Sequence, residues 1–538
     1  MNEALKRPMP EPMGQVEWSN QLLYPVVLMA VGAAAVMVSS LLGALLLIVG
    51  FAWLAYRSIP AGLAAYIVMA PFPLEIIVHA HKLAVSDAMA ILLLAMVVWT
   101  IRQQTETHQA GEFRGRLWQT FFPKEYRWAL VLLLGISVLS LGVALSHSGT
   151  VIKILEYIEF FVVVIGIARF SGQSESAWKL YFYALFAVAG IVSLIGIGQF
   201  LVGAGPISNQ IAVFHVRASS IFGQPNPFGG FDADIFPLLA AFIVLGPKTL
   251  PRRWLTVILV LVGLGVITSY SRGAWASDVT AVFFMGVLAY LTKGKSVLVR
   301  FIEYAVLIPI ALFVVADVVG KVDLKPVYHH LIGGGAKHHV ASSAAQLHHG
   351  VTHAVVKVAK KHHHAKFTVF AHANPLSKLT SLIGAIFHPH KYYDVQQRFL
   401  IWGSAWHAFL KHPLLGVGLG NFHLYIQAHR PKNLVGGIPP MAHDLYLEWA
   451  ADLGVGGFVA AIWLEWRWVL SGIRAVRASV AQMDDFWYAA ALGSFGTVVA
   501  FIMQNFIDLL IDHGVVVPFL LAMALITTVL ARSRGAGT

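Results

Sequence analysis

His443 is the residue best placed for chemistry, because it lies between a long polar segment, residues 320–442, and an apolar run. A neutral imidazole can take the proton of an attacking hydroxyl, which makes His443 a candidate general base. Three arginines, Arg217, Arg272 and Arg398, are expected on the same side of the apolar runs as this histidine. Guanidinium groups bind anionic oxygens through paired hydrogen bonds and stabilise a negative leaving group. This combination predicts an anionic ligand.

Residues next to these positions are further candidates. Asp444 follows the histidine and could orient its ring, and Trp402 stands four residues after Arg398, on the same face of a predicted aromatic helix. The glycine series at 416–420 lacks a surrounding βαβ unit, so it is interpreted as a tight turn and not as a nucleotide loop.

The composition indicates a polytopic membrane protein. Apolar residues make up 58% of the 538 residues and charged residues only 12%, with a mean hydropathy of +0.71. Cysteine is absent, which excludes disulfides, thiolate nucleophiles and cysteine-based zinc sites. The net charge of +12 is assigned to short loops between spans, so no nucleic-acid partner is expected.

The expected fold is all-α, with about 12–14 transmembrane helices and one large, mainly helical extracytoplasmic loop. The predicted parts are a cytoplasmic tail (1–21), about 11 spans (22–319), the large loop (320–442), about three spans (443–531) and a cytoplasmic tail (532–538). The predicted spans include 61–78 and 301–319 before the loop, and 443–464 and 487–508 after it. No cleaved signal peptide is expected at the polar start.

Basic residues predict the orientation of this bundle. Placing Lys6 and Arg7 in the cytoplasm also puts the basic clusters of the other short loops there, including Arg532 and Arg534. Both termini are therefore expected in the cytoplasm, and the large loop with His443 is expected outside.

The first half of the loop contains a histidine-rich segment, residues 328–372. Apolar residues recur there at three- and four-residue spacing, which predicts an amphipathic helix on the outer leaflet. His349 and His353 have the spacing of a zinc-binding pair, but no acidic residue falls between Asp323 and Asp394 to complete a site. No metal site is predicted.

Acidic residues within the apolar runs leave two alternatives open. Asp232 and Asp234 resemble the acidic metal-binding pair found in some polyprenyl-phosphate glycosyltransferases, although we interpret them as polar residues inside the bundle. With Glu156, Glu159 and Asp278, they could instead line the ion path of a membrane transporter.

Four stretches in order resemble the O-antigen ligase and O-antigen polymerase superfamily of bacterial membrane proteins. They are Arg217-Ala218 with the 223–228 stretch that contains Asn226, Ser271–Trp275, Arg398 through Phe422, and His443 through Phe458. The histidine-rich insert is a departure from that pattern.

The resemblance implies a glycosyltransferase of the bacterial plasma membrane that takes a glycan from undecaprenyl pyrophosphate. It points to His443, Arg272 and Arg398 as catalytic residues, and to Arg217 and Asn226 as substrate-binding residues beside Trp402 and Asp444. Metal-independent, inverting transfer without a cofactor is expected, with a lipid or glycan acceptor and membrane lipids as further partners. A polymerase of lipid-linked repeat units and a protein O-oligosaccharyltransferase remain alternatives.

Overall fold

In the computed structural model, the described residues are 20–35, 40–78, 81–105, 110–203, 210–212, 215–301, 393–434, 441–511 and 514–535. The histidine-rich segment 328–372 and nearly all of the predicted span at 301–319 lie outside these ranges. The amphipathic helix and the His349–His353 pair therefore stay predictions.

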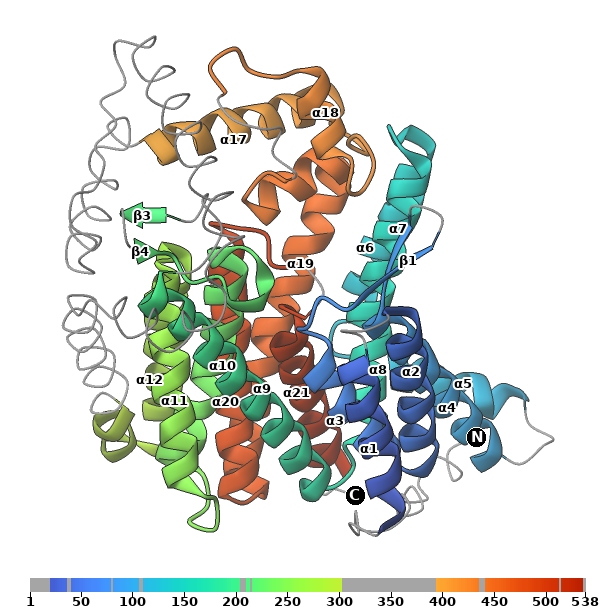
Figure 1. Cartoon of the computed structure of the whole chain (residues 1–538), viewed down its shortest axis with the longest axis vertical. Coiled ribbons are helices and arrows are strands. Elements are labelled where there is room, and N and C mark those ends of the chain that lie inside the picture. Colours follow the sequence, from blue (N-terminus) through green and yellow to red (C-terminus); the bar gives the residue numbers. More distant parts are fainter. Residues whose placement is uncertain are drawn as a thin grey trace, which may run out of the picture.

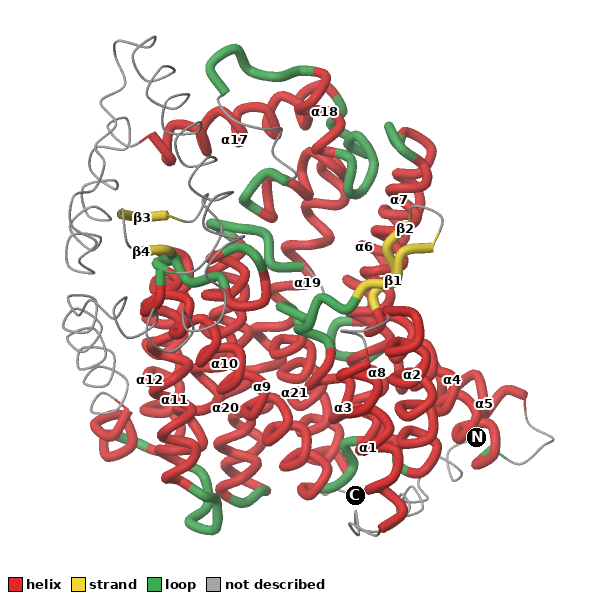
Figure 2. Tube along the Cα trace, viewed as in Figure 1, coloured by secondary structure: helices red, strands yellow, loops and turns green. Residues whose placement is uncertain are grey.

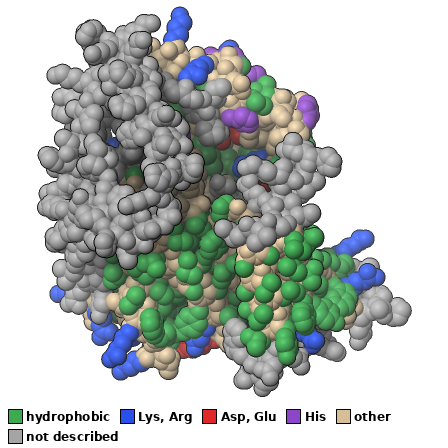
Figure 3. All heavy atoms as spheres, viewed as in Figure 1, with side chains coloured by type: hydrophobic (Ala, Val, Ile, Leu, Met, Phe, Trp, Pro, Cys, Tyr) green, Lys and Arg blue, Asp and Glu red, His purple; other side chains and the backbone are tan. Residues whose placement is uncertain are grey.

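Long apolar helices form the core of the bundle (Figure 1). In the described ranges, eight helices are long and apolar enough to span a membrane. They are α4 (Val85–Gln104), α9 (Glu175–Val202), α10 (Pro225–Leu245), α11 (Arg252–Ser269), α12 (Arg272–Lys293), α19 (Leu445–Gln482), α20 (Asp485–Asn505) and α21 (Val517–Gly535). Apolar side chains cover the bundle surface in Figure 3, with Lys and Arg gathered at its lower edge. The chain is thus an all-α polytopic membrane protein, as predicted.

Shorter helices complete the bundle. They are α1 (Asn20–Ala35), α2 (Ser40–Arg57), α3 (Ile59–Met69), α5 (Ala110–Phe121), α6 (Arg127–Leu139), α7 (His147–Ile158) and α8 (Ile165–Ser171), with the 3₁₀ segments η2 (Ser140–Val143) and η5 (Ser220–Phe222) and the π-helical segment η3 (Glu159–Val164). The strands visible in Figure 2 form two small antiparallel pairs. β1 (Glu75–Val78) pairs with β2 (His81–Ala84), and β3 (Gln210–Ala212) pairs with β4 (His215–Val216).

One predicted span is shorter in the structure than in the sequence interpretation. The run at 61–78 forms α3 only as far as Met69, and the chain then turns into β1. Pro71 and Pro73 explain this end, because a proline disfavours helical backbone in the residue before it and cannot donate a helical hydrogen bond.

Helix α10 occupies the centre and carries the chain to the site. It packs against α9, α11, α12 and α20, and nearly all of its residues are buried. A Cβ added at Gly493 of α20 would lie 2.9 Å from Leu238 Cα, so glycine allows these two helices to approach closely. This contact brings the start of α10 beside the end of α20.

Two helices of the large loop, α17 (Tyr393–Lys411) and α18 (Phe422–Ala428), lie beyond one end of the bundle, at the top of Figure 1. The aromatic helix predicted to end at His412-Pro413 is confirmed as α17. We refer to this end of the bundle as the site end, and to the end at which α21 finishes as the opposite end.

Helix α19 is much longer than the predicted span at 443–464 and is kinked at Gly454, whose φ is 65° and ψ is −163°. A Cβ at Gly454 would lie 2.5 Å from the carbonyl carbon and oxygen of Leu414. The kink therefore lets the chain after α17 pack directly on the α19 backbone.

Candidate active site at the start of α19

His443 is held in a left-handed backbone conformation, with φ of 55°. Two carboxylates fix the turn around it: Glu448 Oε2 accepts the Ala442 N–H at 2.6 Å, and Asp444 Oδ1 accepts the Leu447 N–H at 2.9 Å. Left-handed backbone is uncommon outside glycine and is found at functional sites when surrounding bonds over-determine it. The start of α19 thus aims one histidine at the cost of local backbone strain.

Asp508 is the carboxylate bonded to this histidine. Its Oδ1 lies 2.9 Å from His443 Nδ1, and the Asp508 side chain is 7% exposed against 26% for the histidine. Asp508 stands in the connection between α20 and α21. Sequence reasoning gave the orienting role to Asp444, but the Asp444 carboxylate instead caps α19.

A hydrogen-bonded chain extends from Asp508 to Arg217. Asn226, in the first turn of α10, donates from Nδ2 to Asp508 Oδ2 at 2.5 Å. Its Oδ1 in turn accepts from Arg217 Nη2 at 2.8 Å. Arg217 also donates to the carbonyls of Ser269 and Tyr270, at 3.0 and 3.3 Å. The structure therefore joins Arg217, Asn226 and His443 in one network through Asp508.

Arg398 of α17 reaches the same connection, because its Nη1 donates to the Ile507 carbonyl. Its charge acts on the carboxylates of both Asp508 and Asp444. Helix α17 therefore brings a cation from the large loop to the residues around His443.

Arg272 occupies the first position of α12, whose N-cap Ser271 accepts the Ala274 N–H. Tyr270, two residues before Arg272, also has a left-handed backbone conformation, with φ of 52°. Since the Tyr270 carbonyl accepts from Arg217, Arg272 begins its helix at the same corner of the site end. Arg217 thus bonds the α11–α12 turn, from which Arg272 starts α12.

Trp402 lies on α17 one turn after Arg398, and its ring packs edge-on against Phe399 with 5.4 Å between centroids. Its indole Nε1 is buried without a hydrogen-bond partner among the described residues. The structure supplies no contact between Trp402 and His443, so its assignment to substrate binding stays a prediction.

The glycine series is a structural brace that joins the loop to α19. Asp452 accepts the backbone N–H groups of Gly420 at 2.6 Å and Phe422 at 2.8 Å. Asn421 bonds Thr150 Oγ1 at 2.5 Å and accepts the Ser146 N–H at 2.9 Å, which ties the same turn to α7. Buried backbone donors are therefore satisfied by side chains, as a tight turn requires.

Electrostatics at the site separate the two aspartates. Burial acts to raise the pKa of Asp508, but the hydrogen bond and charge of His443 and the charge of Arg398 outweigh it and lower that pKa below its ordinary value. Burial raises the pKa of Asp444, against the opposing effects of its backbone hydrogen bonds and Arg398. Asp508 is therefore the carboxylate held ionised beside the histidine.

Asp232 and Asp234 are fully buried in α10, which confirms their interpretation as polar residues inside the bundle. Ser193 donates to both oxygens of Asp232, at 3.2 and 3.0 Å. In the part of the chain that the structure describes, no three His, Asp or Glu side chains are grouped to hold a metal ion.

Asp508 and Glu448 are the residues that sequence reasoning missed. Asp508 is the last residue of the predicted span at 487–508, so hydropathy treats it as part of a membrane helix. A carboxylate at the end of an apolar run is costly unless it is paired, and that cost was the available signal.

The family comparison bears on the stretch that carries most of this site. Residues 256–462 match the family model described as O-antigen ligase, and this range contains Arg272, Arg398 and His443. No curated protein matches the chain. The matched family transfers glycans, with lipid-linked glycan and membrane lipid as its general partners. This match confirms the resemblance seen in the sequence: residues 256–462 are similar to the O-antigen ligase family.

Proposed function

We propose that this protein transfers a glycan from a polyprenyl pyrophosphate, undecaprenyl pyrophosphate in bacteria, to an acceptor hydroxyl, with His443 as general base. The observation that carries the proposal is the 2.9 Å contact between His443 Nδ1 and the buried Asp508 carboxylate. When Nδ1–H donates to Asp508, the opposite ring nitrogen, Nε2, is left as the proton acceptor.

The reaction step follows from this tautomer. The acceptor oxygen attacks the anomeric carbon while its proton passes to His443 Nε2, and the carbon–oxygen bond to pyrophosphate breaks with its electron pair on the pyrophosphate oxygen. A direct displacement of this kind inverts the anomeric configuration. Asp508, with its lowered pKa, stabilises the imidazolium that forms.

Arginines supply the second requirement, stabilisation of the departing pyrophosphate. Arg398 on α17 bonds the α20–α21 connection that carries Asp508. Arg272 starts α12 next to Gly273, which packs against Gln504 near the end of α20. Their planar donor groups match phosphate oxygens, so this proposal needs no metal ion. Asn226 donates to Asp508 and accepts from Arg217, so these two residues help to orient the carboxylate that bonds the base.

The membrane setting places this chemistry at a bilayer surface. The site lies at the end of the bundle covered by α17 and α18 (Figure 1), where a lipid-anchored pyrophosphate sits at headgroup depth. By the distribution of basic loops, this is the outer face of the plasma membrane. The same residues serve a ligase, a polymerase or a protein O-oligosaccharyltransferase, which differ in the acceptor.

The test is glycan transfer by purified protein from a defined polyprenyl-pyrophosphate donor. His443→Gln keeps a polar side chain but lacks a base, and we expect kcat to fall by about 10²–10⁴-fold. His429→Gln is the matched control, since His429 is exposed at the end of α18 and bonds the Tyr425 carbonyl. Full activity of folded His443→Gln, or an equal loss in both variants, would contradict the assignment.

A further inference from the structure

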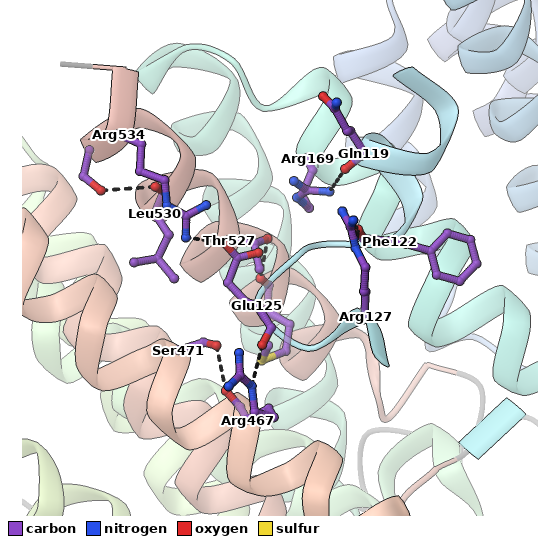
Figure 4. Close-up of polar contacts among 12 residues, drawn as sticks. Gln119, Phe122, Glu125, Arg127, Arg169, Arg467, Ser471, Thr527, Leu530 and Arg534 are labelled. Atoms are coloured by element: carbon purple, nitrogen blue, oxygen red, sulfur yellow. Dashed lines mark hydrogen bonds and ion pairs between the residues drawn. The ribbon is translucent and has the colours of Figure 1, made fainter. Parts of the chain in front are cut away.

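Four arginines lie around the connection between α5 and α6, at the opposite end of the bundle, and Figure 4 shows their polar contacts. They are Arg127 of α6, Arg169 of α8, Arg467 of α19 and Arg534 of α21. All of them bond the last turn of α5 or the elbow between α5 and α6. We call these four residues the arginine cluster.

Most hydrogen bonds of the arginine cluster are donated to neutral backbone carbonyls. Arg127 donates to the Phe122 carbonyl at 3.0 and 3.3 Å, and Arg467 donates to the Glu125 carbonyl at 2.6 Å. Arg169 donates to the Gln119 carbonyl at 2.9 Å. Backbone carbonyls orient these guanidinium groups without cancelling their charge.

One ion pair belongs to the cluster in the part of the chain that the structure describes. Arg534 Nη2 lies 2.6 Å from Glu125 Oε1, and the Glu125 side chain is 4% exposed against 43% for Arg534. The carbonyl end of α5 adds about half a negative charge through its helix dipole. Four guanidinium groups face one carboxylate, so the cluster keeps a net positive charge.

Unsatisfied donors mark the same elbow. Arg169 Nε and the Tyr126 hydroxyl are both buried without a hydrogen-bond partner among the described residues. The two groups interact electrostatically, and Arg169 also lies within reach of the charges of Arg127 and Arg534. The Glu125 carboxylate offsets part of this repulsion, and a bound anion would offset the rest.

Exposed tryptophans place the cluster at the depth of lipid headgroups. Trp128 is 65% exposed beside Arg127, and Trp466 is 59% exposed beside Arg467. Arg127 also lies over the ring of the partly exposed Trp118, 5.5 Å from its centroid. Tryptophan is enriched at the membrane–water interface, where its ring contacts acyl chains and its N–H contacts headgroups.

We infer that the arginine cluster and its flanking tryptophans bind the phosphate headgroup of an anionic phospholipid in the adjoining leaflet. Basic recesses between transmembrane helices on this face of a membrane protein recognise anionic headgroups in this way. Arginines that only set orientation have no need to be ordered around one elbow, with an excess of charge and tryptophans on both sides. This site is independent of the proposed transfer reaction.

The experiment titrates the purified full chain in neutral detergent with phosphatidylglycerol and follows bound lipid by native mass spectrometry. Phosphatidylcholine and inorganic phosphate are run in parallel. We expect phosphatidylglycerol to bind, and Arg127→Gln to weaken that binding about fivefold, the usual contribution of one basic residue near anionic lipid. Arg474→Gln is the matched control, because Arg474 is exposed on α19 outside the cluster.

Glu125→Gln separates charge from packing. This variant loses the ion pair with Arg534 but gains net positive charge, so its phosphatidylglycerol binding should equal or exceed that of the wild type. Weakened binding in Glu125→Gln, equal weakening in Arg127→Gln and Arg474→Gln, or equal binding of phosphatidylcholine would overturn the inference. Competition by inorganic phosphate at matched concentration would overturn the lipid as its source.

Discussion

His443 Nδ1 and Asp508 Oδ1 lie 2.9 Å apart, although 65 residues separate them along the chain. The contact joins the turn before α19 to the connection between α20 and α21. A histidine next to a buried carboxylate has a defined tautomer and a defined ring orientation, and both are properties that a general base needs.

Asp508→Asn should abolish most activity without unfolding the protein. Asparagine has nearly the same shape, but its amide can donate to Nδ1 and so favour the tautomer whose Nε2 is already protonated. By analogy with an orienting aspartate in a catalytic triad, we expect kcat to fall by about 10³–10⁴-fold. Asp444→Asn is the control, because asparagine is also a good N-cap and should leave kcat near normal. Equal losses in the two variants would remove the special role of Asp508.

Replacement of His443 itself should reveal its strained backbone. His443→Gly and His443→Ala both remove the imidazole, but only glycine adopts φ of 55° without steric cost. We therefore expect the glycine variant to be more stable than the alanine variant by about 1 kcal/mol, measured by thermal unfolding in detergent. At a residue with ordinary backbone the order is reversed. A more stable alanine variant would argue against the left-handed turn.

The sequence predicted the candidate residues better than it predicted their partners. His443, Arg398, Arg217 and Asn226 were identified from residue type and order, and the structure brings them to one place. The role of Asp508 was not predicted, because hydropathy alone assigns the end of an apolar run to the membrane span. Which carboxylate faces a histidine depends on long-range packing, and no spacing along the chain encodes it.

The same limit applies to the helices. Hydropathy located the apolar runs, because burial in lipid dictates their composition. It missed the length and kink of α19, since those depend on contact between Gly454 and the chain after α17. The structural role of the glycine series could not be predicted from its own residues, because it depends on a hydrogen bond to Asp452, thirty-two residues after Gly420.

Gly273→Ala should disturb the relation between Arg272 and Asp508. A Cβ at Gly273 would lie 3.0 and 3.1 Å from the side-chain amide atoms of the buried Gln504. The backbone carbonyl of Gln504 accepts the Asp508 N–H at 3.0 Å. Displacement of Gln504 should raise KM for the lipid-linked donor several-fold, with a smaller change in stability. Gly286→Ala, on the same helix, meets only Leu298 at 3.4 Å and should behave like the wild type. Partial recovery in Gly273→Ala/Gln504→Ala would show that the two residues act through this contact.

Gly454→Ala should destabilise the protein through the kink of α19. The substitution forces an L-residue into φ of 65° and places a Cβ 2.5 Å from the Leu414 carbonyl. We expect a loss of about 2–3 kcal/mol in the free energy of unfolding, together with faster proteolysis of the α17–α18 region. Gly456→Ala provides the comparison, because its Cβ would make only an ordinary contact at 3.4 Å with Ile136. Similar unfolding midpoints for the two variants would contradict the prediction.

The lowered pKa of Asp508 predicts a stability difference that depends on pH. The folded protein binds fewer protons at this group than the unfolded chain, whose aspartates titrate near pH 4 (about 3.9). The stabilisation is therefore fully present above that value and is lost as the pH falls through the folded pKa. We expect the difference in Tm between the wild type and Asp508→Asn to shrink between about pH 5 and about pH 3. A difference that stays constant or grows over this range would show that Asp508 is not held ionised by His443 and Arg398.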